Sequence, residues 1–405
     1  MVEATAPGCT RMTVYHCDPW SLSLPESWDP GQVRGAHRRL LAERPQPAVP
    51  TVAGAALRYV PVLTPPRQVW AAHARAHDEA LRTALRGRPL DAAVVHAHVG
   101  LRGGWVALRN ARPDARVFVT EHASFLDRVL EQPEARAMYD EVLHRCTGFF
   151  AVGEPVRRLL YETFPHHEGR VGLIPNPVSF DHHRPAPVTQ LRRWLFVGNL
   201  IPRKGVDWLL EAFALCRAED PELTLTLVGE GSMERRLTAL SAELGLTEAV
   251  TFAGPVPPGE ALRMMREHDL LVHPSRLETF GMTVVEAVAA GLPVLVTRSG
   301  GPQETLAGIE EAAGELIDVE ENAESIADGY RRLRARFPHG LDLPRARRVL
   351  AERYGVEAVG RAHHGHWFGG ADRTDEADGA DGPDSRPRAP HHPHHPSPDE
   401  LEKEA

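Results

Sequence analysis

The feature that most constrains this 405-residue chain is its alternation of short apolar runs with amphipathic stretches. Apolar runs of about four to eight residues are typical of buried parallel strands. In the first half they are RMTVYH, LRYVPVL, DAAVVHAHV, RVFVTEH and FFAVGE, and in the second half RRWLFVGN, LTLTLVG, AVTFAG, DLLVHPS and PVLVTR. The amphipathic segments between them include Gly205–Arg217, Ser232–Leu244 and Gly259–His268. This repetition predicts an α/β fold of doubly wound domains with mostly parallel sheets.

We predict that the chain divides in the segment VSFDHHRPAPVTQ, which is rich in Pro and His and directly precedes a new strand. We predict two Rossmann-like domains, over residues 1–185 and 190–353, facing a cleft where the carboxyl ends of their sheets meet. A helix over 354–368 is expected to pack back toward the first domain. The tail over 369–405 is rich in Asp, Pro and His and is predicted to be disordered.

Charge and cysteine usage exclude several classes of protein. The formal net charge is −9, but ten acidic and only four basic residues lie from Ala371 onward, so the body is near balance. Nucleic-acid binding needs a strongly basic surface, so we expect no nucleic-acid partner. The four scattered cysteines form no C-x-x-C pair, which favours free thiols. With neither a signal-peptide pattern nor an apolar run of about 18 residues, we expect a cytoplasmic protein, and peripheral contact with a membrane surface stays open.

Lysine is almost absent from the chain. Of 46 Lys and Arg residues only Lys204 and Lys403 are lysine, a bias expected of a GC-rich bacterial gene. Lys is a compact charge on a flexible stem and suits a point contact to a phosphate, for which the planar Arg is not equivalent. The single lysine of the folded body, Lys204, is therefore a candidate phosphate-binding residue.

The densest motif is HPSRLETFGMTVVEAVAAGLPVLVTRSGG, which begins at His273. A strand ends at its start, a tight loop then brings Glu278 to the carboxyl edge of the sheet, and Gly281 opens a helix that Gly291 closes. The amino end of such a helix carries unpaired N–H groups and a positive dipole, which suit a diphosphate. Glu286 lies about one turn into the helix, so two carboxylates can accept hydrogen bonds from paired hydroxyls in one cleft.

This segment resembles the signature of glycosyltransferase family 4, whose members are retaining enzymes of the GT-B fold. The resemblance covers roughly residues 91–368. It implies that Glu278 contacts hydroxyls of the donor sugar and that Glu286 contacts the ribose. It assigns the acceptor to the first domain and the nucleotide sugar to the second. The amide groups that hold the phosphates would be those of Phe280, Gly281 and Met282.

A second motif is LFVGNLIPRKGVDWLLEAF, a strand followed by a glycine-containing loop and a helix. Lys204 at the helix start is expected to direct its charge at the donor phosphates. The family usually has a basic residue after the first glycine, where this chain has Asn199, which donates a hydrogen bond but carries no charge. Arg203, beside Lys204, is expected to compensate for the missing charge.

The third motif is VTEHASF in the first domain, where His122 follows a strand. The resemblance implies that His122 contacts the donor sugar near its reacting carbon. It also assigns Gly229 and Gly231 of VGEGS to the nucleotide, and Val256 of FAGPVP to the loop that holds the base. One departure is clear: the Gly-Gly loop that family members often carry after the first strand is replaced by a segment with only spaced glycines.

These residues predict a metal-independent, retaining hexosyl transfer from a UDP- or GDP-type sugar to an acceptor hydroxyl, with no cofactor other than this co-substrate. His122, Lys204 and Glu278 are the predicted catalytic residues. No carboxylate is placed for a double displacement, so the resemblance implies reaction on one face, with the departing diphosphate stabilised electrostatically. The acceptor is a glycan, a lipid-linked molecule or a small molecule. Two alternatives stay open: an inactive sugar-nucleotide-binding protein and a nucleotide-sugar epimerase of the same fold.

Overall fold

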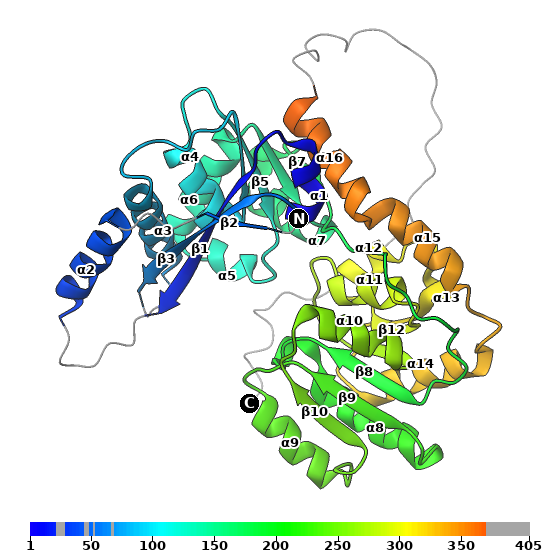
Figure 1. The fold of residues 1–405 in the computed structure, drawn as a ribbon. Coiled ribbons are helices and arrows are strands. Elements are labelled where there is room, and N and C mark those ends of the chain that lie inside the picture. The colour runs from blue at the N-terminus through cyan, green and yellow to red at the C-terminus, as the bar shows by residue number, and fades with distance from the viewer. Residues whose placement is uncertain (22–28, 44–47, 52, 66–68, 370–405) are drawn as a thin grey trace. The chain divides into compact units, whose positions relative to one another are not determined.

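The computed structural model describes residues 1–21, 29–43, 48–51, 53–65 and 69–369 (Figure 1). The predicted disordered tail, apart from Gly369, lies outside these described residues. Within them, every helix is too short or too polar to traverse a bilayer.

The chain begins with a three-stranded sheet of order β1-β3-β2. Strands β1 and β3 pair in parallel over their full length, and the short β2 pairs with β3 in the antiparallel sense. The elements of this part are α1 (Val2–Thr5), η1 (Ala6–Gly8), β1 (Thr13–Ser21), α2 (Pro30–Glu43), β2 (Val49–Pro50), β3 (Ala56–Thr64) and α3 (Trp70–Ala84). Among the described residues, β1 and β3 hydrogen-bond to no strand of the following sheet, so the first domain contains two sheets.

The second sheet is entirely parallel, with the order β4-β5-β6-β7. Its strands are β4 (Val94–His98), β5 (Arg116–Glu121), β6 (Gly148–Ala151) and β7 (Val171–Leu173). The connecting helices and turns are η2 (Gly100–Trp105), α4 (Val106–Asn110), α5 (Leu126–Leu130), α6 (Pro133–Arg145), α7 (Glu154–Thr163) and η3 (Pro165–His167). The carboxyl ends of β4 and β5 lie side by side, because His98 pairs with Thr120 in the register.

The third sheet is parallel and six-stranded, with the order β10-β9-β8-β11-β12-β13 (Figure 1). Its strands are β8 (Arg193–Val197), β9 (Thr224–Val228), β10 (Val250–Gly254), β11 (Leu270–His273), β12 (Val294–Thr297) and β13 (Gly314–Ile317). The chain moves outward from β8 to β10 and then returns to β11 on the other side of β8. The strand order therefore reverses between β8 and β11, which is where open α/β sheets bind ligands.

Helices pack on both faces of this sheet. The helices are η4 (Pro202–Lys204), α8 (Val206–Glu219), α9 (Glu234–Glu243), α10 (Pro258–Glu267), α11 (Met282–Ala289), α12 (Gly301–Thr305), α13 (Glu310–Ala313) and α14 (Ala323–Arg336). Trp194 and Phe196 of β8 pack with α8, α9 and α14, whereas Leu195 between them packs with α10 and α11. A strand buried on both faces explains why RRWLFVGN is continuously apolar rather than alternating.

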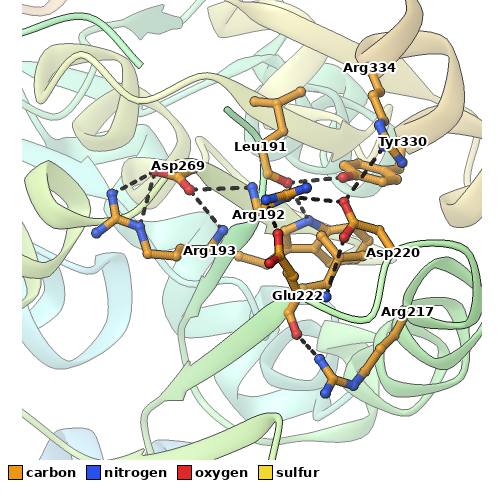
Figure 2. Close-up of polar contacts among 11 residues, drawn as sticks. Leu191, Arg192, Arg193, Arg217, Asp220, Glu222, Asp269, Tyr330 and Arg334 are labelled. Carbon is orange, nitrogen blue, oxygen red and sulfur yellow. Dashed lines mark hydrogen bonds and ion pairs between the residues drawn. The ribbon is translucent and has the colours of Figure 1, made fainter. Parts of the chain in front are cut away.

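The amino ends of the same strands are held by a polar cluster (Figure 2). Asp269, just before β11, accepts a hydrogen bond from the backbone N–H of Arg193 at 2.9 Å and another from its guanidinium at 2.7 Å. The hydroxyl of Tyr330 donates to the carbonyl of Leu191 at 3.0 Å. These contacts stabilise the edge of the sheet opposite the strand ends at which a ligand is expected.

The last two helices are α15 (Leu343–Tyr354) and α16 (Val356–Phe368). Val359 and Trp367 of α16 lie in one apolar cluster with residues of the second sheet. These are Phe118 on β5, Phe150 on β6 and Ile174, which directly follows β7. The indole N–H of Trp367 also donates to Nδ1 of His96 at 3.0 Å. The helix that follows the second half of the chain thus completes the core of the first half.

Candidate functional site

A nearly buried ion pair joins the loops that follow β8 and β11. Lys204 ends the short turn η4 after β8, and Glu278 lies in the loop after β11. The Lys204 ammonium donates a hydrogen bond to Oε1 of Glu278, and the two side chains are only 11% and 10% exposed. The switch point of the sheet therefore brings together two of the predicted catalytic residues.

His273, the last residue of β11, is a third member of this group and was not predicted from the sequence. Its Nε2 is 2.9 Å from Oε1 of Glu278, and its ring stacks on Phe196 at 5.5 Å between centroids. Complete burial lowers the pKa of His273 and outweighs its carboxylate neighbour, so the ring is neutral and donates from Nε2. The sequence carried no clear signal for this contact, because it depends on the direction of the two side chains across the turn after β11.

These contacts decide the ionisation of Glu278. Burial alone would raise the pKa of this carboxyl, but the hydrogen bond from His273 and the charge of Lys204 outweigh it and hold the pKa far below its usual value. Glu278 is consequently a fixed carboxylate at neutral pH. Such a group accepts hydrogen bonds from hydroxyls and cannot act as a general acid.

Backbone contacts fix the loop that carries Glu278. The N–H of Glu278 donates to the carbonyl of Ser299 at 2.8 Å, and the N–H of Gly301 donates to the carbonyl of Glu278 at 2.9 Å. The N–H of Arg276 donates to the carbonyl of Arg203 at 2.8 Å, which ties the loop to the turn that carries Lys204. Hydrogen bonds between the two loops thus hold the backbone that carries Lys204 and Glu278.

Helix α11 begins as the motif predicts. Gly281 is its N-cap residue and has φ +83°, a left-handed conformation that glycine adopts without strain. No side chain of the described residues caps the first turn, which leaves the amide end of the helix available to a ligand. Phe280 is buried and packs edge-on against Tyr354, and Met282 is half-buried. The amide groups assigned to the phosphates therefore lie at a well-packed helix start.

Glu286 occupies a different environment from Glu278. It is half-buried on α11, and burial raises the pKa of its carboxyl. Among the described residues, no hydrogen bond or ion pair joins Glu286 to Glu278 or Lys204. Its carboxylate therefore has free hydrogen-bonding capacity, and the structure does not link the two glutamates of the motif directly.

His122 follows β5 in the first domain and contacts a second histidine. Its Nε2 lies 2.8 Å from Nδ1 of His98, at the end of the adjacent strand β4. Mainly burial lowers the pKa of His122, which leaves a neutral imidazole. The loop is anchored by the fully buried Glu121, which accepts hydrogen bonds from the N–H groups of His122 at 2.8 Å and Ala123 at 2.7 Å. No described contact joins His122 to Lys204 or Glu278.

Arg203 links the second and third motifs. Its guanidinium donates to Oγ of Ser124 at 3.0 Å and to the carbonyl of Leu277. In this state the Arg203 side chain holds two loops together, so its predicted phosphate contact would require it to exchange these partners.

The remaining predicted donor residues lie in neighbouring loops. Asn199 is exposed after β8, and Val256 is half-buried after β10.

A Cβ on Gly229 would lie 2.0 Å from the carbonyl oxygen of Gly198, and one on Gly231 would lie 2.3 Å from that of Leu200. The two glycines therefore permit close packing of the β8 and β9 loops, a structural role that accounts for them without a nucleotide.

Known protein families match both halves of the chain. Residues 180–335 match the family described as "Glycosyl transferases group 1", and residues 32–182 match "Glycosyltransferase Family 4". The D-inositol 3-phosphate glycosyltransferase of Thermobispora bispora is 30% identical over 326 residues, which cover 70% of this chain and 74% of that protein. The chain belongs to glycosyltransferase family 4. A second relative of the same name, from Nocardia farcinica, is 29% identical over 55% of each chain, so this match spans about half of that protein's length.

Solved structures place this family 4 chain in the GT-B fold. Sucrose-phosphate synthase from Thermosynechococcus elongatus aligns with a TM-score of 0.65 at 21% identity, covering 87% of this chain and 97% of that one. Anabaena HepE, solved in complex with UDP and glucose, aligns with a TM-score of 0.61 at 16% identity, covering 87% and 98%. The predicted architecture of two Rossmann-like domains is thereby confirmed.

Proposed function

We propose that this chain transfers a hexosyl group from a nucleotide diphosphate sugar to an acceptor hydroxyl, with retention of configuration and without a metal ion. The observation that carries the proposal is the pairing of Lys204 with the ionised Glu278 at the switch point of the second-domain sheet. A cation for phosphate and a fixed acceptor for hydroxyl groups lie side by side there.

The main task of the site is to stabilise a leaving diphosphate. Lys204 supplies a full positive charge, and the amino end of α11 supplies N–H groups with a partial positive charge. Preorganised groups of this kind act on the charge that develops in the transition state. The donor phosphates would share the Lys204 ammonium with Glu278, and in the proposed metal-free reaction the amino end of α11 would supply the further positive charge.

The state of Glu278 supports a reaction on one face of the sugar. A double displacement needs a carboxylate free to attack the anomeric carbon. Oε1 of Glu278 already accepts hydrogen bonds from both Lys204 and His273, which lowers its nucleophilicity and suits it to binding hydroxyls. The neutral His122 would then assist the sugar by hydrogen bonding rather than by charge.

A UDP- or GDP-sugar is the proposed donor, and UDP is the first to test because it occupies the related HepE structure. The names of the curated relatives, D-inositol 3-phosphate glycosyltransferase and mannosylfructose-phosphate synthase, favour a small phosphorylated acceptor over a glycan or a lipid-linked one. We expect the reaction to take place in the cytoplasm, where nucleotide sugars are made.

The test is donor turnover by the purified chain with UDP-, GDP- and dTDP-sugars. Slow hydrolysis of one donor is expected without acceptor, unaffected by a chelator and abolished in Glu286→Ala and Lys204→Ala. Unchanged turnover in both variants would overturn the proposal. NMR of the products separates the alternatives, because an epimerase yields a new nucleotide sugar and an inactive binding protein yields none.

A further inference from the structure

Three side chains converge on one point of the first domain, on elements that carry none of the proposed donor residues. Asp140 lies on α6, and His166 and His167 lie on the turn η3. Oδ1 of Asp140 is 2.6 Å from Nε2 of His166 and 3.0 Å from Nε2 of His167. In the part of the chain that the structure describes, these are the residues whose metal-ligating atoms gather, all within 4.8 Å of one another.

The chemistry of these three groups matches a transition-metal ligand set. Two imidazole nitrogens and one carboxylate oxygen are ligands that Zn²⁺ and similar ions prefer, with solvent completing the coordination. A metal ion binds imidazole in its neutral form and carboxylate in its charged form, so this ligand set complements a divalent cation.

The geometry requires only a small adjustment. Metal–ligand bonds of about 2.0–2.2 Å place tetrahedral ligand atoms about 3.4 Å apart. The observed separations from Asp140 are 2.6 and 3.0 Å, so the ligands would need to spread by less than about 1 Å. His167 is 5% exposed and held by its surroundings, whereas His166 at 60% and Asp140 at 41% are open to solvent. One ligand is therefore preorganised, and an ion has a path of entry.

A further histidine lies close to the three. His144 is four residues after Asp140 on α6, and residues at this spacing share one face of a helix. Its ring centroid is 6.4 Å from that of His167. A small rotation of the exposed His144 side chain would bring a fourth protein ligand toward the same ion.

We propose that Asp140, His166 and His167 form a binding site for a Zn²⁺-class ion that fastens η3 to α6. The ion would close a segment of 26 residues that contains β6 and α7. An ion bound by the folded chain and not by the unfolded chain stabilises the fold. The site is structural and independent of the transfer reaction, which it leaves unchanged.

The test is the thermal unfolding of the full-length chain in Zn²⁺. His391, His392, His394 and His395 are first replaced by Ser in the full-length protein, because the tail histidines would compete for the ion. In this background, saturating Zn²⁺ is expected to raise Tm by about 5 °C. His166→Ala and Asp140→Asn should each remove the rise, and His182→Ala, a change at another exposed histidine, should retain it.

His166→Ala is the decisive variant because its exposed side chain is not needed for folding, which circular dichroism without metal would verify. Co²⁺ binding supplies a second readout, as an absorption spectrum in the parent that the variant lacks. No Zn²⁺-dependent rise in the parent, or an equal rise in His166→Ala, would overturn the proposal. In that case the three side chains are only a hydrogen-bonded contact between η3 and α6.

Discussion

The carboxyl edges of two parallel sheets in this molecule have opposite electrostatic characters. The second-domain edge holds Lys204 and the ionised Glu278 beside the neutral His273. The first-domain edge holds His98 and His122, whose pKa values are lowered mainly by burial, while the fully buried Glu121 binds backbone N–H groups. A nearly buried ion pair thus lies on the side proposed for the diphosphate, and uncharged imidazoles lie on the side proposed for the sugar.

Removal of the cation from the charged edge is the largest expected effect. Lys204→Ala should lower kcat/KM for donor hydrolysis by about 10³-fold, because it removes one preorganised charge from the leaving group. Lys403→Ala, a change at the only other lysine, is the matched control and should leave the rate unchanged. Steady-state kinetics measure both. Equal rates for the two variants would show that the charged edge is not where the diphosphate leaves.

The histidine-rich part of the first domain should lose stability in acid through a different residue. His363 of α16 is fully buried, neither ring nitrogen has a partner among the described residues, and mainly burial lowers its pKa to about 4. Its charged or titratable neighbours include His96, His98, His122, His364, His366 and the amino terminus.

The unfolded chain protonates this histidine near pH 6.5 and the folded chain only near pH 4. Stability is therefore complete above about pH 6.5 and decreases as the pH falls through this window, by about 3 kcal/mol in total. Urea unfolding at pH 7.5 and pH 4.5 measures the decrease. His363→Phe should reduce it, and an unchanged pH dependence in this variant would assign acid sensitivity to other groups.

The third prediction concerns His273, a positioning residue that acts through Glu278. His273→Gln should lower kcat/KM by about 10- to 100-fold, the range found for residues that orient an active group. It should also raise the pKa of Glu278, so the acid limb of the pH–rate profile moves to higher pH. A fall in rate with an unmoved acid limb would mean that His273 serves packing against Phe196 alone.

The smallest expected effect tests the missing charge at Asn199. Asn199→Arg restores the basic residue that resemblance to the family leads one to expect, and should lower KM for the donor by about fivefold while kcat changes little. Asn199→Ala is the control and should change neither constant by much, because the exposed amide adds no charge. An arginine that raises KM would show that this loop does not face the donor phosphates.

The periodicity of the sequence predicted five strands of the third sheet, β8 to β12, and Gly281 and Gly291 predict the limits of α11. The sixth strand, β13, was not predicted, because its four residues GELI form no continuous apolar run. The separation of the first domain into two sheets was not predictable, because pairing between strands depends on contacts far apart in sequence.

The site was only partly predictable for a related reason. The motif indicates Lys204 and Glu278, and the structure pairs them. It does not indicate that His273 hydrogen-bonds to the same oxygen of Glu278. It also does not indicate that Arg203 donates a hydrogen bond to Ser124 in the first domain. Such partners depend on the direction of side chains across a turn, which residue spacing alone does not determine.

Calorimetric titration of a nucleoside diphosphate and its sugar conjugate into two variants tests the central claim most directly. If Lys204 binds the phosphates and Glu278 binds the sugar, Lys204→Ala weakens both ligands, whereas Glu278→Gln weakens the sugar nucleotide but does not weaken the nucleoside diphosphate. Wild-type affinity for both ligands in both variants, or equal losses for both ligands in Glu278→Gln, would contradict the account.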